Sequence, residues 1–325
     1  MKIAFTTELP PVGFQRLKDH TLNTPLHEAD ILVSTFDKPV TRAMLLSAPN
    51  LRLVANFGAG YNNIDLDTCR ERGIRVTNTP MPVVEPTAEL AFSLMHALAR
   101  RTAELDRHLR RQNEPTYKPR IQWGVMENLS HSLYGKTLGI IGMGHIGQAL
   151  ARRAVAAGMS VIYHNRKPVD IHHLQMADNL SDTAKRMQQT AVESAKYVSM
   201  DELLEQSDFV SLNLPYTPEV HHLINTDAFG KMKKTAYFIN TARGAHVDEQ
   251  ALVKALQQGQ IAGAALDVYE HEPHITDELL LTDNVVLSPH TGTGTWEGRI
   301  EMCENVCDNI LAFVRGETDK MNIVL

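Results

Sequence analysis

The fold is decided by one stretch of sequence, Gly135-Lys136-Thr137-Leu138-Gly139-Ile140-Ile141-Gly142-Met143-Gly144-His145-Ile146-Gly147. It predicts a buried strand that runs into a Gly-x-Gly-x-x-Gly turn, followed by a helix over 148–157. A dinucleotide site needs this order, because one glycine makes the tight turn, one lets the backbone approach pyrophosphate and one allows close helix packing. The helix N-terminus then offers free N–H groups to the phosphates. A glycine-rich turn without a ligand is the alternative, and the strand-and-helix context favours nucleotide binding.

Short β-rich runs alternate with helical runs on both sides of this stretch. A long helix at 83–109 separates two such series, and a final helix at 296–315 follows the second. This alternation predicts an α/β protein with two doubly wound, parallel-sheet domains. If the final helix packs back on the first domain, residues 1–102 and 292–325 form one discontinuous domain around a second at 103–291. The expected strands are 2–5, 30–33, 51–57, 74–77, 136–141, 159–163, 209–214, 235–240, 262–267 and 285–287.

Composition narrows the class of protein. The chain has 325 residues, which predicts about two domains. Its net charge of −6 without a basic run disfavours a nucleic-acid surface. No apolar stretch is long enough to span a bilayer, and the N-terminus turns polar too soon for a signal peptide. Three cysteines do not make a disulfide framework, so we expect a cytoplasmic protein.

The residues after the strand at 159–163 bear on cofactor choice. An NAD site usually carries an acidic residue here to bind the ribose hydroxyls. The chain has His164, Asn165, Arg166 and Lys167 instead, and the nearest acid, Asp170, lies beyond the expected strand end. Two cations fit a 2′-phosphate better than a hydroxyl, although they could simply be solvated charges. We therefore expect NADP(H) to be preferred, with NAD(H) possible.

Three further segments follow predicted strands: 240–244, 267–273 and 288–292. They carry Arg243, Glu272 and His290. Arginine can grip a carboxylate with two hydrogen bonds, histidine can exchange a proton near neutral pH, and glutamate can orient the imidazole. Taken singly, each residue is more often a surface group than a catalyst. Carboxyl ends of parallel strands gather ligands at one edge of a sheet, so together they predict a catalytic site.

At this point the sequence resembles a known family, the D-isomer-specific 2-hydroxyacid dehydrogenases, and within it most closely the glyoxylate/hydroxypyruvate reductases. The resemblance runs from about Leu51 to Arg315. It is carried by the glycine motif, by the three segments above, and by Asn56-Phe57-Gly58-Ala59-Gly60-Tyr61-Asn62-Asn63-Ile64-Asp65, Asn78-Thr79-Pro80, Thr87-Ala88-Glu89-Leu90 and Leu214-Pro215-Tyr216-Thr217-Pro218-Glu219.

The resemblance implies a Rossmann dinucleotide-binding domain inserted into a flavodoxin-like substrate domain. It implies that His290 protonates the keto oxygen, that Glu272 pairs with its other ring nitrogen, and that Arg243 binds the substrate carboxylate. The backbone of Ala59 and Gly60 matches a second grip on that carboxylate. The positions that match or face the cofactor are Thr87, Gly142, Gly144, His145, Ile146, Gly147, Asn165, Arg166, Lys167, Pro215, Thr241 and Asp267.

The expected activity is reduction of a small 2-oxo acid, of the glyoxylate or hydroxypyruvate type, to the D-2-hydroxy acid. Pyruvate and 2-ketogluconate remain alternative substrates, and a non-catalytic dinucleotide sensor on the same fold is the alternative function. The family departures, His145 for arginine and Thr291 and Thr293 for isoleucine and serine, leave the three catalytic positions intact.

The other conspicuous residues have plainer interpretations. The pairs His172-His173 and His221-His222 are read as surface residues, so no metal is expected. Cys303 and Cys307 are read as buried thiols. The resemblance implies a homodimer and places Trp123 in a dimerisation arm, with local packing as the alternative.

Overall fold

The chain divides into two compact units. The computed structural model describes every residue except 10, 117–122, 172–173, 175 and 177–179. Unit 1 comprises residues 1–86 and 293–325, and unit 2 comprises residues 87–292. The first boundary therefore falls at residue 86, earlier than the expected 102. Among the described residues, no helix combines the length and the apolar character that crossing a membrane requires.

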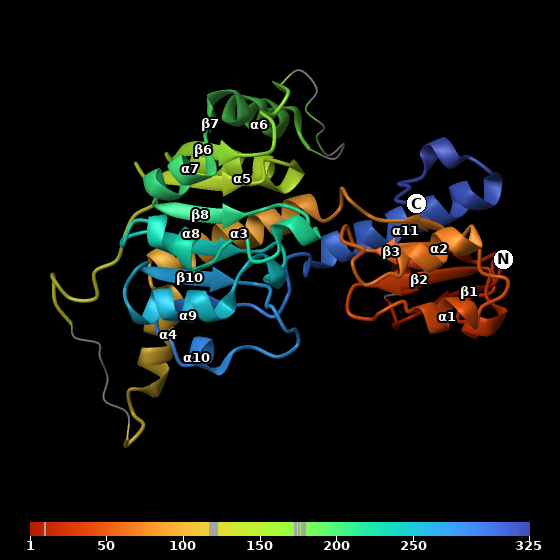
Figure 1. Ribbon diagram of the computed structural model, residues 1–325, viewed down its shortest axis with the longest axis horizontal. Coiled ribbons are helices and arrows are strands. Elements are labelled where there is room, and N and C mark those ends of the chain that lie inside the picture. The colour runs from red at the N-terminus through yellow and green to blue at the C-terminus, as the bar shows by residue number, and fades with distance from the viewer. Residues whose placement is uncertain (10, 117–122, 172–173, 175, 177–179) are drawn as a thin grey trace. The chain divides into compact units, whose positions relative to one another are not determined.

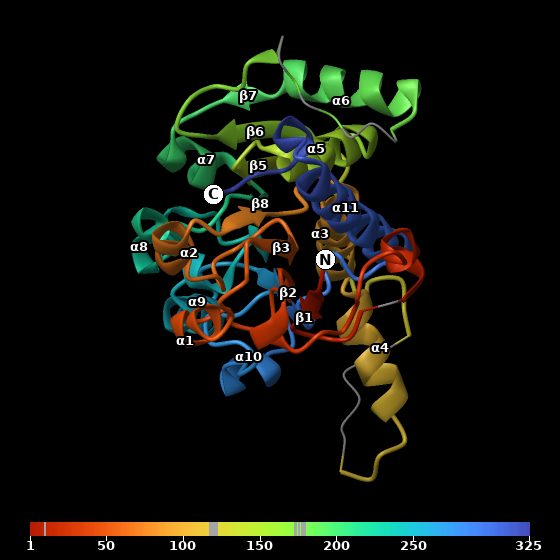
Figure 2. The same cartoon turned by 90° about the vertical axis from the view of Figure 1, so that its right-hand side faces the viewer.

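Unit 1 is a parallel sheet with helices on both faces. Its strands lie in the order β1-β2-β3-β4, and Lys2 forms a further parallel bridge to Thr21 at the free edge of β1. In Figure 2, α1 and α2 lie on one side of these strands and α11 on the other. The elements are β1 Ile3–Phe5, β2 Ile31–Thr35, α1 Arg42–Leu46, β3 Leu53–Phe57, α2 Leu66–Arg72, β4 Arg75–Thr77 and α11 Trp296–Arg315, with short 3-10 helices at Pro11–Leu17, Leu26–Glu28 and Thr318–Lys320.

Helix α11 returns the end of the chain to the first sheet. Thr295 caps its start by accepting from the N–H of Gly298, and Gly316 ends it in the left-handed conformation. Its buried side chains Met302, Cys303, Val306 and Ile310 join the core over β1–β3. Unit 1 is therefore built from two separate segments of chain.

Unit 2 is a larger parallel sheet in the order β11-β10-β9-β8-β5-β6-β7, which is the dinucleotide-binding order 3-2-1-4-5-6 with one more strand. Figure 1 shows this stack from β7 through β6 and β8 to β10. Its elements are α3 Val84–Ala99, α4 Thr102–Arg111, β5 Thr137–Ile141, α5 His145–Ala156, β6 Ser160–His164, α6 Asp182–Ser194, β7 Lys196–Tyr197, α7 Met200–Gln206, β8 Phe209–Leu212, η4 Pro218–Val220, α8 Thr226–Lys231, β9 Tyr237–Asn240, η5 Gly244–His246, α9 Glu249–Gln257, β10 Gly263–Leu266, α10 Asp277–Leu280 and β11 Val285–Leu287.

The single helix expected at 83–109 is two helices. Arg101 takes a left-handed conformation, with φ of 55°, and separates α3 from α4. Its guanidinium donates to both carboxylate oxygens of Glu104 and to the carbonyl of Leu129, while the carbonyl of Ala99 accepts from the N–H of His131. The N–H of His131 thus occupies the carbonyl of Ala99, which a continuous helix would have bonded within itself.

Candidate active site

The glycine turn lies between β5 and α5, beside the carboxyl end of β8. This is the point where the strand order of the sheet reverses. Gly142 has φ of 98°, and a Cβ there would lie 2.8 Å from the carbonyl group of Asn213, so both conformation and space require glycine. Helix α5 begins at His145 rather than at the expected Gln148. His145, Ile146 and Gly147 therefore form its first turn, where N–H groups have no partner within the helix.

The turn has the features that a dinucleotide requires. Apart from Gly144 and its two neighbours in the chain, no described atom lies within 4 Å of the position that a Cβ would take there, so the backbone is open to an approaching phosphate. At the end of β9, the hydroxyl of Thr241 is buried and has no hydrogen-bond partner among the described residues. Buried hydroxyl groups are normally hydrogen-bonded, so this one is suited to a bound group. The residues present therefore fit a nicotinamide dinucleotide.

The residues expected at the ribose, Asn165, Arg166 and Lys167, differ in their exposure and in the contacts that they already make. Asn165 already accepts the N–H of Met143 through its side-chain oxygen at 2.7 Å, so it holds the phosphate turn to the end of β6. Arg166 and Lys167 are exposed. Glu219 lies close enough to Arg166 to interact with its charge; a hydrogen bond from Thr217 is the main cause that lowers the pKa of Glu219, and Arg166 contributes less. The guanidinium therefore has a carboxylate neighbour that the sequence analysis did not consider.

Pro215 and Thr87 occupy different surroundings. Pro215 is exposed on the segment after β8, and its carbonyl oxygen lies 3.4 Å from Nε2 of His246. Thr87 is buried near the start of unit 2. A Cβ on Gly292 would lie 3.4 Å from the hydroxyl of Thr87 and 3.1 Å from the carboxylate of Asp267, so these two predicted cofactor residues face the same small space.

His290 and Glu272 form a direct pair. His290 Nδ1 lies 2.7 Å from Glu272 Oε2, and the N–H of Tyr269 donates to Oε1 of the same carboxylate at 2.9 Å. Burial alone would raise the pKa of Glu272, but the hydrogen bond and charge of His290, with smaller contributions from Tyr269 and Arg243, bring it below its ordinary value. Glu272 is therefore a carboxylate at neutral pH and can stabilise a positive charge on the imidazole.

Asp267 holds the loop that carries His290. Its two carboxylate oxygens accept the N–H groups of Thr291 and Gly292, each at 2.7 Å, and its carbonyl accepts the N–H of His290 at 2.8 Å. Tyr269 adds a hydrogen bond from its hydroxyl to the carbonyl of Ser288 at 2.9 Å, and burial raises the pKa of this phenol to about 12. The loop that carries His290 is thus held by hydrogen bonds from Asp267 and Tyr269.

Arg243 lies on a loop that packs directly on the Glu272 loop. A Cβ on Gly244 would lie 1.9 Å from the carbonyl group of Tyr269, so the two loops meet backbone to backbone. Asn240 closes the arginine loop by donating to the carbonyl of Arg243 and accepting the N–H of Ala242, both at 3.0 Å. Burial lowers the pKa of the Arg243 guanidinium, while Glu272 acts in the opposite direction. Arg243 therefore lies within electrostatic range of Glu272, the carboxylate that holds His290.

Sequence reasoning did not single out His246. Its ring lies between two carbonyl oxygens, with Nδ1 3.1 Å from that of Arg243 and Nε2 3.4 Å from that of Pro215. The side chain is fully buried, and burial lowers its pKa. It connects the arginine loop to the segment after β8. The motif 240–244 ends before His246, so a search for motifs had no signal for it.

In unit 1, Ala59 and Gly60 follow β3 with their carbonyl groups engaged. Asn78 donates to the carbonyl of Ala59 at 2.9 Å, and Asn56 donates to that of Gly60 at 2.8 Å. Their own N–H groups donate to no acceptor within the described part of the chain. Two free backbone donors in succession can bind an anion.

The structure brings a third residue to one of the histidine pairs. Ligand atoms of His221, His222 and Glu270 all lie within 4.8 Å of one another, and His222 Nε2 lies 2.5 Å from Glu270 Oε1. However, the two imidazoles stack at 4.0 Å with only 20° between their planes, so their nitrogen lone pairs run side by side instead of meeting at one point. Such a stacked pair does not present a metal-ligand geometry. His172 and His173 lie outside the described residues.

The chain is similar to known proteins over nearly its whole length. Residues 92–292 match the family model described as D-isomer specific 2-hydroxyacid dehydrogenase, NAD binding domain. A glyoxylate reductase from Korarchaeum cryptofilum is 39% identical over 332 aligned positions, covering 97% of this chain and 93% of the relative. The crystal structure of a glyoxylate reductase from Paecilomyes thermophila is 31% identical, with a TM-score of 0.82, and covers 100% of this chain and 98% of that one. An NADPH-dependent glyoxylate/hydroxypyruvate reductase from Sinorhizobium meliloti, solved with NADP and malonate, is 29% identical, with a TM-score of 0.77 and coverage of 96% and 93%.

Proposed function

Because the chain belongs to the D-isomer specific 2-hydroxyacid dehydrogenase family, we propose that it reduces a small 2-oxo acid to the D-2-hydroxy acid with a reduced nicotinamide dinucleotide. The observation that carries this proposal is the 2.7 Å pair of His290 and Glu272 beside the charge of Arg243. These groups provide a proton donor and a binding site for the substrate carboxylate. Reduction of an α-keto acid requires both from the protein.

Each residue has a separate task in this mechanism. Arg243 binds the substrate carboxylate through two charge-assisted hydrogen bonds and draws electron density from the neighbouring carbonyl. His290 donates a proton from Nε2 to the keto oxygen, and Glu272 stabilises the protonated imidazole beforehand. The N–H groups of Ala59 and Gly60 provide a second grip on the carboxylate, as the family resemblance implies. The dinucleotide, held at the turn 142–147, supplies the hydride when it is bound.

Glyoxylate or hydroxypyruvate is the proposed substrate. The relatives are named for glyoxylate and hydroxypyruvate reduction, and one guanidinium with two backbone donors suits a compact α-carboxylate. The test measures kcat/KM for glyoxylate, hydroxypyruvate, pyruvate and 2-ketogluconate with NADPH and NADH, and the chirality of the product from hydroxypyruvate. Activity confined to compounds without an α-carboxylate, or formation of the L-product, would overturn the proposal.

NADPH is the proposed preferred cofactor. Arg166 and Lys167 follow β6 without an acidic residue at the strand end, and both are exposed and able to meet a 2′-phosphate. A bidentate guanidinium–phosphate pair of this kind is worth about one to two decades of preference. Glu219 opposes part of this gain, because its carboxylate attracts Arg166 and repels a phosphate.

A homodimer in the cytoplasm is the proposed setting. Trp123, Val125 and Met126 expose between 74% and 93% of their surface, far more than apolar side chains of a monomer usually do. The family resemblance implies that a second copy of the chain packs against this segment. Sedimentation velocity should show a dimer that dissociates in the double variant Val125→Asp, Met126→Asp and persists in Glu127→Gln. A wild-type protein that is monomeric at micromolar concentration would exclude the dimer.

A further inference from the structure

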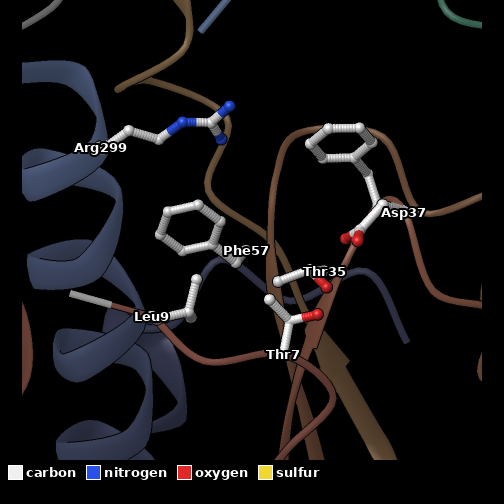
Figure 3. Close-up of a pocket in the computed structure, with 7 residues that line it drawn as sticks. Thr7, Leu9, Thr35, Asp37, Phe57 and Arg299 are labelled. Carbon is white, nitrogen blue, oxygen red and sulfur yellow. The ribbon is translucent and has the colours of Figure 1, made fainter. Parts of the chain in front are cut away.

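Arg299 and Glu249 are charged side chains that belong to none of the sets described above. Figure 3 shows Arg299 reaching from α11 toward a cavity of about 320 Å³ in unit 1, near the ring of Phe57. The cavity surface is almost wholly apolar, and the guanidinium lies 5.7 Å from the ring centre of Phe57 and 6.0 Å from that of Phe36. Aromatic faces attract cations, so these rings account for Arg299. Glu249 instead binds a loop of the candidate active site.

Glu249 is a buried carboxylate at the start of α9, with only 4% of its surface exposed. It is the first residue of that helix, and Asp248 before it caps the helix by accepting the N–H of Ala251 at 3.0 Å. A helix N-terminus stabilises a negative charge beside it. Leu252 and Leu256 of the same helix are buried in the core of unit 2, so the carboxylate is carried by a rigid element.

Both oxygens of Glu249 accept hydrogen bonds from the segment 270–276, which contains Glu272. Oε1 accepts the N–H of Glu270 at 2.6 Å, and Oε2 accepts the hydroxyl of Thr276 at 2.5 Å. Thr276 is also the N-cap residue of α10, where a threonine side chain usually accepts an N–H of the first turn. It forms no such bond here, because its hydroxyl serves Glu249 instead. Glu249 therefore anchors both ends of the segment.

Between these anchors, a turn brings Glu272 to His290. The N–H of His274 donates to the carbonyl of His271 at 2.9 Å, which closes the turn with Glu272 inside it. The N–H of Tyr269 donates to Oε1 of Glu272, and Oε2 is left to meet Nδ1 of His290 at 2.7 Å. The segment is short and bonded within itself, so a movement of its ends would carry Glu272 away from the imidazole.

The side chain of Glu270 has partners of its own. Its Oε1 lies 2.5 Å from Nε2 of His222, and its Oε2 accepts the N–H of Glu249 at 3.4 Å. His222 thus holds the side chain of this residue and Glu249 holds its backbone. The first anchor is therefore fixed from two directions.

We propose that Glu249 is a positioning residue for the reduction: by binding both ends of the segment 270–276, it holds the carboxylate of Glu272 against Nδ1 of His290. This role rests on the proposed function, in which His290 donates the proton and Glu272 is its partner. Glu249 acts on the reacting atoms only through these two side chains. Its loss should loosen their pair and leave the binding of the substrate carboxylate by Arg243 in place.

The tautomer of His290 tests this placement without any turnover. The nitrogen that carries the proton of a neutral imidazole is set by its hydrogen-bond partners, and a carboxylate beside Nδ1 favours the Nδ1–H form. Long-range proton–nitrogen NMR spectra of the full-length protein at about pH 9, where histidine is neutral, distinguish the two forms. The signals of His290 are those missing from His290→Ala. Glu249→Ala should shift His290 toward the Nε2–H form, and an unchanged tautomer in the folded variant would overturn the proposal.

Two matched variants separate positioning from general damage. Glu249→Gln keeps an oxygen for the N–H of Glu270 and an amide that can bond the hydroxyl oxygen of Thr276, so the tautomer should stay that of the wild type. Asp248→Ala removes the cap of α9 and should lower the melting temperature, but it leaves both anchors in place and should not change the tautomer. A change in Asp248→Ala as large as that in Glu249→Ala would refute the specific role of Glu249.

Steady-state kinetics test the same link in the reaction. Glu249→Ala should lower kcat about tenfold to a hundredfold and change KM for the 2-oxo acid little, because the proton donor alone is displaced. In the Glu272→Gln background the same substitution should lower kcat by no more than about twofold, since the group that it positions is gone. Equal losses in the two backgrounds would contradict the proposal. A wild type that reduces no 2-oxo acid would instead overturn the proposed function, and the tautomer would still decide the placement of Glu272.

Thr276→Val keeps the test sound if Glu249→Ala does not fold. It removes the hydroxyl at one anchor while keeping the shape of the side chain, so Oε2 of Glu249 loses its partner. The tautomer of His290 should shift in the same direction by a smaller amount. Thr276→Ser keeps the hydroxyl and should not shift it. Identical tautomers in the two threonine variants would show that this anchor does not hold Glu272.

Discussion

The peptide N–H of His290 donates to the carbonyl oxygen of Asp267 at 2.8 Å, and His290 holds a left-handed conformation with φ of 54°. Such a backbone conformation costs a residue other than glycine roughly 1–3 kcal/mol of conformational free energy. The carboxylate of Asp267 offsets this cost by binding the next two N–H groups, those of Thr291 and Gly292. The direction of the imidazole is therefore set by the backbone of its own loop as well as by Glu272.

The proposed role of His290 as proton donor predicts a large loss of rate in its alanine variant. His290→Ala should lower kcat by a factor of ~10²–10⁴, the usual effect of removing a positioned general acid. This loss of kcat is measured from steady-state reduction of the 2-oxo acid that the wild type reduces with the highest kcat/KM. His274→Ala, at an exposed position on the preceding loop, should keep kcat within about twofold. Near-normal turnover in His290→Ala would remove the histidine from the mechanism.

Arg243 should affect both kinetic parameters. Arg243→Ala should raise KM for the 2-oxo acid about tenfold to a hundredfold, because charged hydrogen bonds are lost, and should lower kcat as well. Arg243→Lys keeps the charge without the planar pair of donors, so its kcat/KM should lie between those of the wild type and Arg243→Ala. An unchanged KM in both variants would show that another group binds the carboxylate.

Glu272 makes stability depend on pH. Its pKa in the folded protein lies below the ordinary 4.5, so the unfolded chain binds its proton more readily. The resulting stabilisation is complete well above pH 4.5 and is lost as the pH falls through the lower folded value. The difference in melting temperature between wild type and Glu272→Gln should therefore be larger at pH 7 than at pH 3. A difference that is the same at both values would contradict the shifted pKa.

Gly244 should tolerate no side chain. Gly244→Ala places a Cβ on the carbonyl group of Tyr269, so we expect the free energy of unfolding to fall by about 3 kcal/mol or more, together with activity. Gly230→Ala is the matched control, because its Cβ meets no atom within 4 Å and lies in helix α8. The free energy of unfolding of Gly230→Ala should rise by up to about 1 kcal/mol. Similar melting temperatures for the two variants would refute the close approach of the loops.

Cofactor choice should depend on Arg166 and Glu219 in opposite directions. Arg166→Ala should lower kcat/KM for NADPH about tenfold or more and change that for NADH little. Glu219→Gln should raise kcat/KM for NADPH, because the carboxylate that competes for Arg166 is gone. If Arg166→Ala leaves NADPH efficiency unchanged, the guanidinium does not bind the 2′-phosphate.

Local patterns were enough to predict the architecture. The alternation of strands and helices predicts two parallel α/β sheets, and the structure confirms both. The glycine motif at 142–147 predicts the turn at the reversal of strand order, because a tight turn and a close backbone approach are requirements on consecutive residues. Arg243, Glu272 and His290 could be grouped in advance, since all three follow parallel strands whose carboxyl ends lie at one edge.

The tertiary structure alone decided which groups those residues meet. The side chain of Asn165 binds Met143, that of Asp267 binds Thr291 and Gly292, and Gly244 lies against Tyr269, all across stretches of 22 to 25 residues. Arg299 likewise reaches a cavity formed by strands near the other end of the chain. The sequence determined which side chains follow each strand, because strands and helices are specified by periodic patterns among neighbouring residues. Their partners depend on how separate loops pack, and packing is a property of the whole folded unit.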